Sequence, residues 1–272
     1  MNSMTTMHRQ NNSFQALVQT LYAALDMDRR IIGVKLFHSK SGYQSVNAKE
    51  LLRPINYCQM TAAASRGNAI KSTRSKINCA SGIRVLGFDH TDTCNATGEN
   101  WIRLGMYKNP DTSREVRGRI GNIPEQTYGI AVQPAEHYET VPDVIMIVTT
   151  PYNIMRLTQG YGYHHGEAKN ISMVGNQAIC LECTAAPYLN DEINISALCI
   201  GTRHQAGWKD TEMAIGIPGS KFADVVDGVL ATINIMESDA KKNQIEEKMK
   251  KAGIDFLPMR YHYNYYTSRQ RL

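Results

Sequence analysis

Several features that would identify a familiar chemistry are missing from this sequence. No run approaches the roughly 18 apolar residues that a membrane-spanning helix needs, and the opening stretch MNSMTTMHRQNNSF lacks the apolar core of a secretory signal. No P-loop is present, and the glycines at 160, 162 and 166 do not form the GxGxxG fingerprint of a dinucleotide site. We therefore expect a cytoplasmic protein without a membrane partner.

The chain also has little excess charge. A formal net charge of +5 over 272 residues, with the lysines and arginines scattered, does not indicate nucleic-acid binding. One basic group, residues 66–76, could steer an anionic substrate, although a solvated basic face explains it more simply. Apolar residues make up 42% of the chain, which is enough to build a substantial core.

The order of apolar and polar residues predicts a mixed α/β protein of the α+β class, with a sheet-based core. Residues 14–25 have helical spacing, and residues 31–37 have the pattern of a buried strand. Residues 143–161 and 213–233 each combine an apolar strand ending near proline with an amphipathic helix, which predicts a degenerate strand–helix internal repeat. Further helices are expected at 57–65 and 78–87, and further short strands at 101–107 and 193–200.

The same pattern divides the chain into three parts. Residues 1–13 are a polar leader, and residues 14–240 form one globular domain or two closely packed halves. Residues 241–272 hold a charged helix and the aromatic tail YHYNYY. Because that tail carries too much aromatic surface to leave in water, we expect it to dock on the body or on a second copy of the chain, giving a homo-oligomer.

Cysteine is scarce and irregularly spaced, which argues against a disulfide scaffold. Of the six cysteines, Cys58, Cys79 and Cys180 are each followed within a few residues by Ala, Ser or Gly, so each could lie where the backbone turns closely around a bulky group. Cys58 and Cys79 are expected at helix starts, where the positive end of the helix dipole lowers a thiol pKa. Cys199 is expected to pack inside the strand at 193–200.

Several motifs occur in an order that resembles the domain-of-unknown-function family 169, from about residue 31 to residue 233. They are GVKLF at 33–37, CQxxA from Cys58, CxxGxxxLGF from Cys79, PDVxxxV from 142, MRLxQGY at 155–161, CxE at Cys180 and Glu182, and GIP at 216–218. The resemblance implies that Cys58, Cys79 and Cys180 form one shared set. The additional Cys183 leaves open which thiol is the third ligand.

If the three thiolates converge, they can hold a [4Fe–4S] cluster in which one iron stays open to substrate. Zinc is the alternative metal, although no compact pair of CxxC elements supports it. An open iron is a Lewis acid, so the sequence predicts a lyase, hydratase or desulfurising enzyme acting on a small, anionic molecule.

Other residues are assigned to this chemistry. Arg203 would orient the substrate, and Glu182, His164 or His165 would move protons. Ordinary ion pairs or solvent exposure would account for the same side chains. Two other functions stay open, a non-enzymatic metal or redox sensor with a partner-binding tail and a structural protein with buried thiols.

Overall fold

The computed structural model describes residues 13–91, 97–233 and 237–254. Its centre is a seven-stranded mixed sheet in the order β2-β3-β4-β1-β5-β7-β6. Neighbouring strands are antiparallel except for β2 and β3, which are parallel. The strands are β1 Ile32–Phe37, β2 Lys49–Glu50, β3 Ile70–Thr73, β4 Gly129–Pro134, β5 Val144–Thr149, β6 Asn194–Ser196 and β7 Met213–Pro218.

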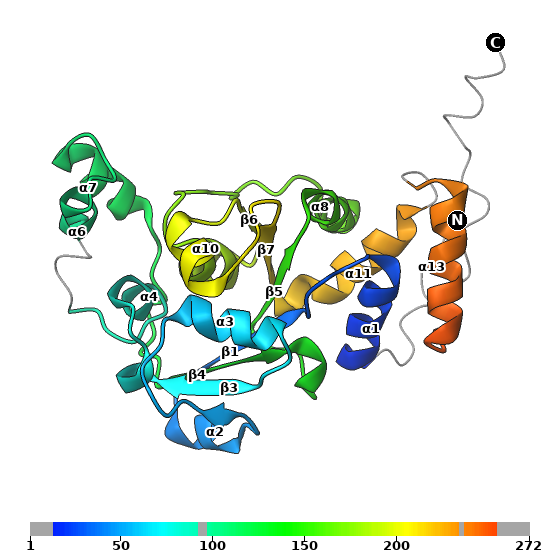
Figure 1. The fold of residues 1–272 in the computed structure, drawn as a ribbon, viewed down its shortest axis with the longest axis horizontal. Helices are drawn as coiled ribbons and strands as arrows, with labels where there is room; N and C mark the ends of the chain where they lie inside the picture. Colours follow the sequence, from blue (N-terminus) through cyan, green and yellow to red (C-terminus); the bar gives the residue numbers. More distant parts are fainter. Residues whose placement is uncertain (1–12, 92–96, 234–236, 255–272) are drawn as a thin grey trace, which may run out of the picture.

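Helices cover both faces of the sheet, so the predicted mixed α+β class is confirmed (Figure 1). One face is packed by α1 Phe14–Ala24, α8 Pro151–His165, α11 Phe222–Ala231 and α13 Asp239–Lys251. The other is packed by α3 Tyr57–Ser65, α4 Ala80–Val85, a π-helix Ala178–Ala185 and α10 Ile200–Ala206. The other α-helices described are α2 Lys40–Ser45, α6 Glu99–Arg103, α7 Pro110–Arg119 and α9 Ala186–Asn190.

The alternation of side chains along β5 explains why the protein has two cores. Val144, Met146 and Val148 face the core beneath α3 and the π-helix, whereas Ile145 and Ile147 face the core beneath α8 and α11. Successive strand residues point to opposite sides of a sheet, so a strand buried on both sides is apolar throughout. The cysteines of interest all belong to the first core.

The two expected strand–helix units lie side by side. β5 pairs with β7, and α8 packs closely against α11. Glycine is required at this helix crossing, since a Cβ on Gly228 would lie 2.0 Å from the carbonyl oxygen of Gly160. As the sequence predicts, Pro151 opens α8 at its first position.

Two sequence expectations are wrong in detail. The strand expected at 101–107 is instead helix α6, stabilised by an ion pair between Arg103 and Glu99 at 2.6 Å and by burial of Trp101. The strand expected at 193–200 stops at Ser196, because Leu198 takes a positive φ of 64° and α10 begins two residues later.

The charged helix expected near the end of the chain is α13, and Gly253 follows it with a φ of 70°. The aromatic tail lies outside the described residues, as does the leader apart from Ser13. In the part of the chain that the structure describes, no helix has the length and apolarity to cross a membrane.

Candidate metal centre

A short stretch of parallel pairing brings two cysteines together. Ile55 and Ile77 form an isolated parallel bridge, in which the Ile55 amide donates to the Lys76 carbonyl at 3.2 Å and the Asn78 amide donates to the Ile55 carbonyl at 2.9 Å. Each of these two segments runs directly into a helix. Cys58 lies in the first turn of α3, and Cys79 is the N-cap of α4.

Gly82 lies between Cys79 and Cys180. The Cys79 Sγ accepts a hydrogen bond from the Gly82 amide at 3.4 Å. A Cβ on Gly82 would lie 3.5 Å from the Cys79 Sγ and 3.8 Å from the Cys180 Cβ. Gly82, the smallest residue, therefore lies against both cysteines.

Cys180 lies in the π-helix, every residue of which is buried. Single π-turns are rare and often occur at functional sites. Burial raises the Cys180 pKa well above its usual value, and the neighbouring thiols of Cys79, Cys58 and Cys199 raise it further. The other thiol of this helix, Cys183, lies beside Glu182 and Ser196 as well as Cys199. Of the two thiols, Cys180 is the one whose pKa Cys58 and Cys79 also raise.

A fourth cysteine, Cys199, belongs to the same group although the sequence reading assigned it to strand packing. It is the N-cap of α10, and its Sγ accepts a hydrogen bond from the Thr202 amide at 3.4 Å. The Thr202 hydroxyl is buried, lacks a hydrogen-bond partner of ordinary length, and lies beside Cys58, whose pKa it lowers. Thr202 therefore connects Cys199 to Cys58 much as Gly82 connects Cys79 to Cys180.

The sequence does contain a signal for Cys199. In both Cys79-Ala-Ser-Gly82 and Cys199-Ile-Gly-Thr202, the cysteine caps a helix by accepting from the amide three residues later. Cysteine rarely fills the position that Ser, Thr, Asp or Asn usually takes at an N-cap. A search for cysteines at such positions would have found both.

The environment of these thiols disfavours their ionised form in the absence of a cation. Burial raises the pKa of Cys58 to about 11, and the adjacent Cys79 and Cys199 also raise it. The Cys79 pKa is raised as well, first by burial and also by Cys199, against the lowering effect of the Gly82 amide. Metal binding would displace the protons, because thiolates are the ligands.

The thiols are not arranged as ligands of a single zinc ion. Since Zn–S bonds are about 2.3 Å long and tetrahedral, the sulfurs of such a site lie about 3.8 Å apart. Within residues 13–91, 97–233 and 237–254, no three or more His, Cys, Asp or Glu side chains stand where they could hold a single metal ion. The thiols are thus close enough to raise one another's pKa, but they are not arranged as ligands around a single ion.

Comparison with known proteins identifies the family. The family model for domain of unknown function 169, described as uncharacterised ArCR, matches residues 20–228. The chain belongs to this family. It is also 25% identical over 224 residues to the uncharacterized protein MJ0308 of Methanocaldococcus jannaschii, a match that covers 80% of this chain and 94% of that protein. No solved structure matches the chain.

All four converging cysteines lie within the domain-of-unknown-function-169 match, and α13 lies beyond it. Cys94, the remaining cysteine, falls outside the described residues. The candidate site therefore lies within the part of the chain that matches the family.

Glu182, predicted to move protons, is buried beneath a loop of the family domain. Its Oε1 accepts from the Val174 amide at 2.6 Å and the Gly175 amide at 3.0 Å, and its Oε2 accepts from the Ser196 hydroxyl. Burial raises the Glu182 pKa against the lowering effect of these hydrogen bonds. Both of its oxygens are occupied in holding the loop to the π-helix and β6.

Arg203, predicted to bind substrate, donates hydrogen bonds to the backbone carbonyls of Lys209, Ala197 and Glu212. These bonds join α10 to the turn before β7. Its guanidinium therefore fixes the position of the helix that Cys199 caps.

His164 and His165 lie in the last turn of α8, on the face of the sheet opposite the cysteines. His164 pairs with Asp227 at 2.7 Å and His165 pairs with Asp224 at 3.0 Å, both on α11. The fold does not bring either histidine to the cysteine group.

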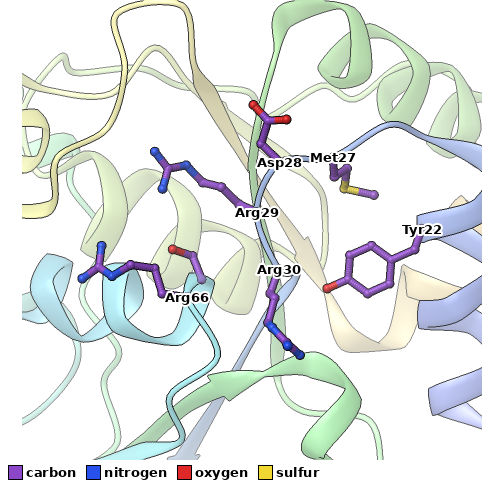
Figure 2. Close-up of a pocket in the computed structure, with 7 residues that line it drawn as sticks. Tyr22, Met27, Asp28, Arg29, Arg30 and Arg66 are labelled. Carbon is purple, nitrogen blue, oxygen red and sulfur yellow. The ribbon is translucent and has the colours of Figure 1, made fainter.

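A pocket of about 410 Å³ opens at the far end of α3 from Cys58 (Figure 2). Arg29 in this pocket is paired with Glu212 at 2.5 Å, and Arg30 is paired with Glu136. Figure 2 shows Arg29 and Arg66 extending to one side while Arg30 extends away from them. The pocket's cations do not converge. Its lining residues are Tyr22, Met27, Asp28, Arg29, Arg30, Ser65 and Arg66.

A second pocket, of about 390 Å³, borders the π-helix through Leu181. Its walls include Tyr107, Val116, Ile120 and Met173, which are mainly apolar. None of the cysteines lines this pocket.

Proposed function

We propose that this protein binds a [4Fe–4S] cluster through Cys58, Cys79 and Cys180 and that it acts in the cytoplasm. The observation that carries the proposal is the position of Gly82, within 4 Å of both Cys79 and Cys180 when a Cβ is placed on it. The Ile55–Ile77 bridge adds Cys58 to that pair. Three thiols from separate helices rarely meet without a shared ligand, although free cysteine is often simply buried.

Iron–sulfur binding explains the site better than zinc. A four-iron cluster fills a wider space between its ligands than a single ion does, which suits thiols that do not stand around one point. Cys58, Cys79 and Cys199 are only half-buried, so iron and sulfide can reach the site from solvent. The amides of Gly82 and Thr202 already donate to sulfur, and such hydrogen bonds tune cluster potentials.

Two activities follow from the number of ligands. When bound through three thiolates, such a cluster supplies an open iron, which would suit a lyase, hydratase or desulfurising reaction on a small anionic molecule. When bound through four, it supplies one-electron redox chemistry, which would suit a redox sensor or electron carrier. The proximity of Cys199 favours the second activity.

The proposal is tested by metal analysis of the full-length protein. After anaerobic purification and reconstitution with ferrous iron and sulfide, we expect about four irons and about four sulfides per chain. Serine at Cys58, Cys79 or Cys180 should lower both contents sharply. Serine at Cys183 is the matched control, since this thiol lies on the same π-helix as Cys180 but is fully buried beside Glu182, Ser196 and Cys199. Full iron in all three single variants would overturn the assignment.

A further inference from the structure

We infer that the Cys199 thiolate is the fourth ligand of the site, so that a bound cluster has a protein sulfur at every iron. This inference rests on the proposed function and makes it more specific. It replaces an open Lewis-acid iron with a closed cluster suited to one-electron transfer.

Thr202 places the helix that begins at Cys199 next to Cys58. Thr202 is 3% exposed, its amide donates to the Cys199 Sγ, and its hydroxyl lies beside Cys58. α10 packs directly against α3, which carries Cys58. Thr202 therefore joins the helix that Cys199 caps to the helix that carries Cys58.

A series of contacts also links Cys199 to the other three thiols. Helix α10, which Cys199 caps, packs against α3, which carries Cys58. The Ile55–Ile77 bridge then sets the start of α3 beside the segment of Cys79, and Gly82 lies against both Cys79 and Cys180. All four cysteines pack in the same core.

Cys183 is the other thiol that could be the fourth ligand. Cys183 is fully buried under β7, where a Cβ on Gly216 would lie 2.4 Å from the Cys183 carbonyl oxygen. Cys199, in contrast, is half-buried and is followed by Ile200, which is 77% exposed. Cys199 can reach a cluster inserted from the surface, whereas Cys183 lies deeper in the core.

A fourth thiolate changes what the site can do. With four protein ligands, a small molecule reaches iron only by displacing a cysteine, so substrate binding is disfavoured. Electron exchange needs no open position. It requires only that the cluster lie near the surface, where three of the four cysteines are half-buried.

The test compares the full-length protein with Cys199→Ala and Cys183→Ala after anaerobic reconstitution with iron and sulfide. Each sample is then oxidised briefly with ferricyanide. A four-iron cluster with an exposed corner gives one electron to ferricyanide and releases that corner as a ferrous ion, which leaves a paramagnetic three-iron cluster. A cluster held by four thiolates resists this conversion.

We expect the unaltered protein and Cys183→Ala to keep about four irons per chain and to give no three-iron EPR signal. Cys199→Ala should fall to about three irons and show the signal. The inference is overturned if the unaltered protein converts as readily as Cys199→Ala. If the unaltered protein binds no iron and sulfide at all, the proposed function itself fails, which is a distinct outcome.

Cys199→Ala could fail to fold, since Cys199 caps α10. Mössbauer spectroscopy of the unaltered protein reconstituted with iron-57 provides an independent check. Four irons with sulfur-only coordination support the inference, whereas one distinct iron with an oxygen or nitrogen ligand contradicts it.

Discussion

Replacing Glu182 tests whether this carboxylate holds the structure together, as its contacts indicate, or is free to move protons. Alanine would leave the Val174 amide and the Ser196 hydroxyl without their partner, while the amide of exposed Gly175 can turn to water. A buried polar group left unsatisfied costs about 1–3 kcal/mol, so we expect Glu182→Ala to lower the free energy of unfolding by about 2–4 kcal/mol.

Glutamine should behave differently. Its Oε1 can accept both backbone amides, and its amide group can donate to the Ser196 Oγ, so the hydrogen-bond pattern survives. We expect Glu182→Gln to change the free energy of unfolding by less than about 1 kcal/mol near neutral pH. Urea unfolding followed by circular dichroism measures both variants.

The pH dependence gives a second readout. The Glu182 pKa is raised by burial, so the folded protein holds a proton over a range in which the unfolded chain has already lost it. Stability should therefore fall as pH rises from the ordinary glutamate pKa of about 4.3 up to the raised value. Glu182→Gln should remove this part of the slope.

Glu192 is the matched control because it accepts hydrogen bonds from the Lys169 and Asn170 amides of the same loop, at 2.7 Å and 2.9 Å, but lies near the surface. Glu192→Ala should cost less than about 1 kcal/mol, since its amides can bond to water. Equal losses at Glu182 and Glu192, or a Glu182→Ala protein as stable as the parent, would refute the reasoning.

Four further substitutions test the packing of the fold. A Cβ on Gly160 would lie 2.5 Å from a backbone oxygen of α11, so Gly160→Ala should lower the free energy of unfolding in urea by about 1–3 kcal/mol. Gly162 on the same helix has open space around it, so Gly162→Ala should raise the free energy of unfolding by about 0.5–1 kcal/mol. Arg156→Met leaves the buried carboxylate of Glu237, 3.2 Å away, without its cation, so we expect a loss of about 3–5 kcal/mol; a loss below 1 kcal/mol would contradict this role. Arg203→Ala removes three hydrogen bonds to carbonyls and should lower the melting temperature; an unchanged melting temperature would return Arg203 to the substrate-binding role.

The sequence predicted the helices that begin beside Cys58 and Cys79 because its local signals agree with the fold. Ala-rich residues after Cys58 and the small residues after Cys79 both favour helices, and helices begin at Tyr57 and Ala80. Their meeting depends on the Ile55–Ile77 bridge, which joins residues far apart in the sequence. No local pattern specifies that pairing.

Cys199 was missed because residues 193–200 alternate like a strand. The alternation holds only through β6, and the positive φ of Leu198 then turns the chain into α10. Such a backbone conformation is unusual for leucine. The strand-like alternation therefore concealed the helix start at Cys199, which the spacing of Cys199 and Thr202 could have indicated.

The π-helix was equally hard to predict. All its residues are buried, so they show no amphipathic period that would distinguish a helix from a strand. His164 and His165 were predicted to move protons at the cysteine site. Both residues end α8, on the face of the sheet opposite the cysteines, and no local pattern specifies which face a helix covers.

Anomalous diffraction at the iron edge, from crystals of the anaerobically reconstituted full-length protein, tests the central claim most directly. We expect one strong iron peak enclosed by the sulfurs of Cys58, Cys79, Cys180 and Cys199. Iron bound anywhere else, or intact crystals with no iron between these sulfurs, would contradict it.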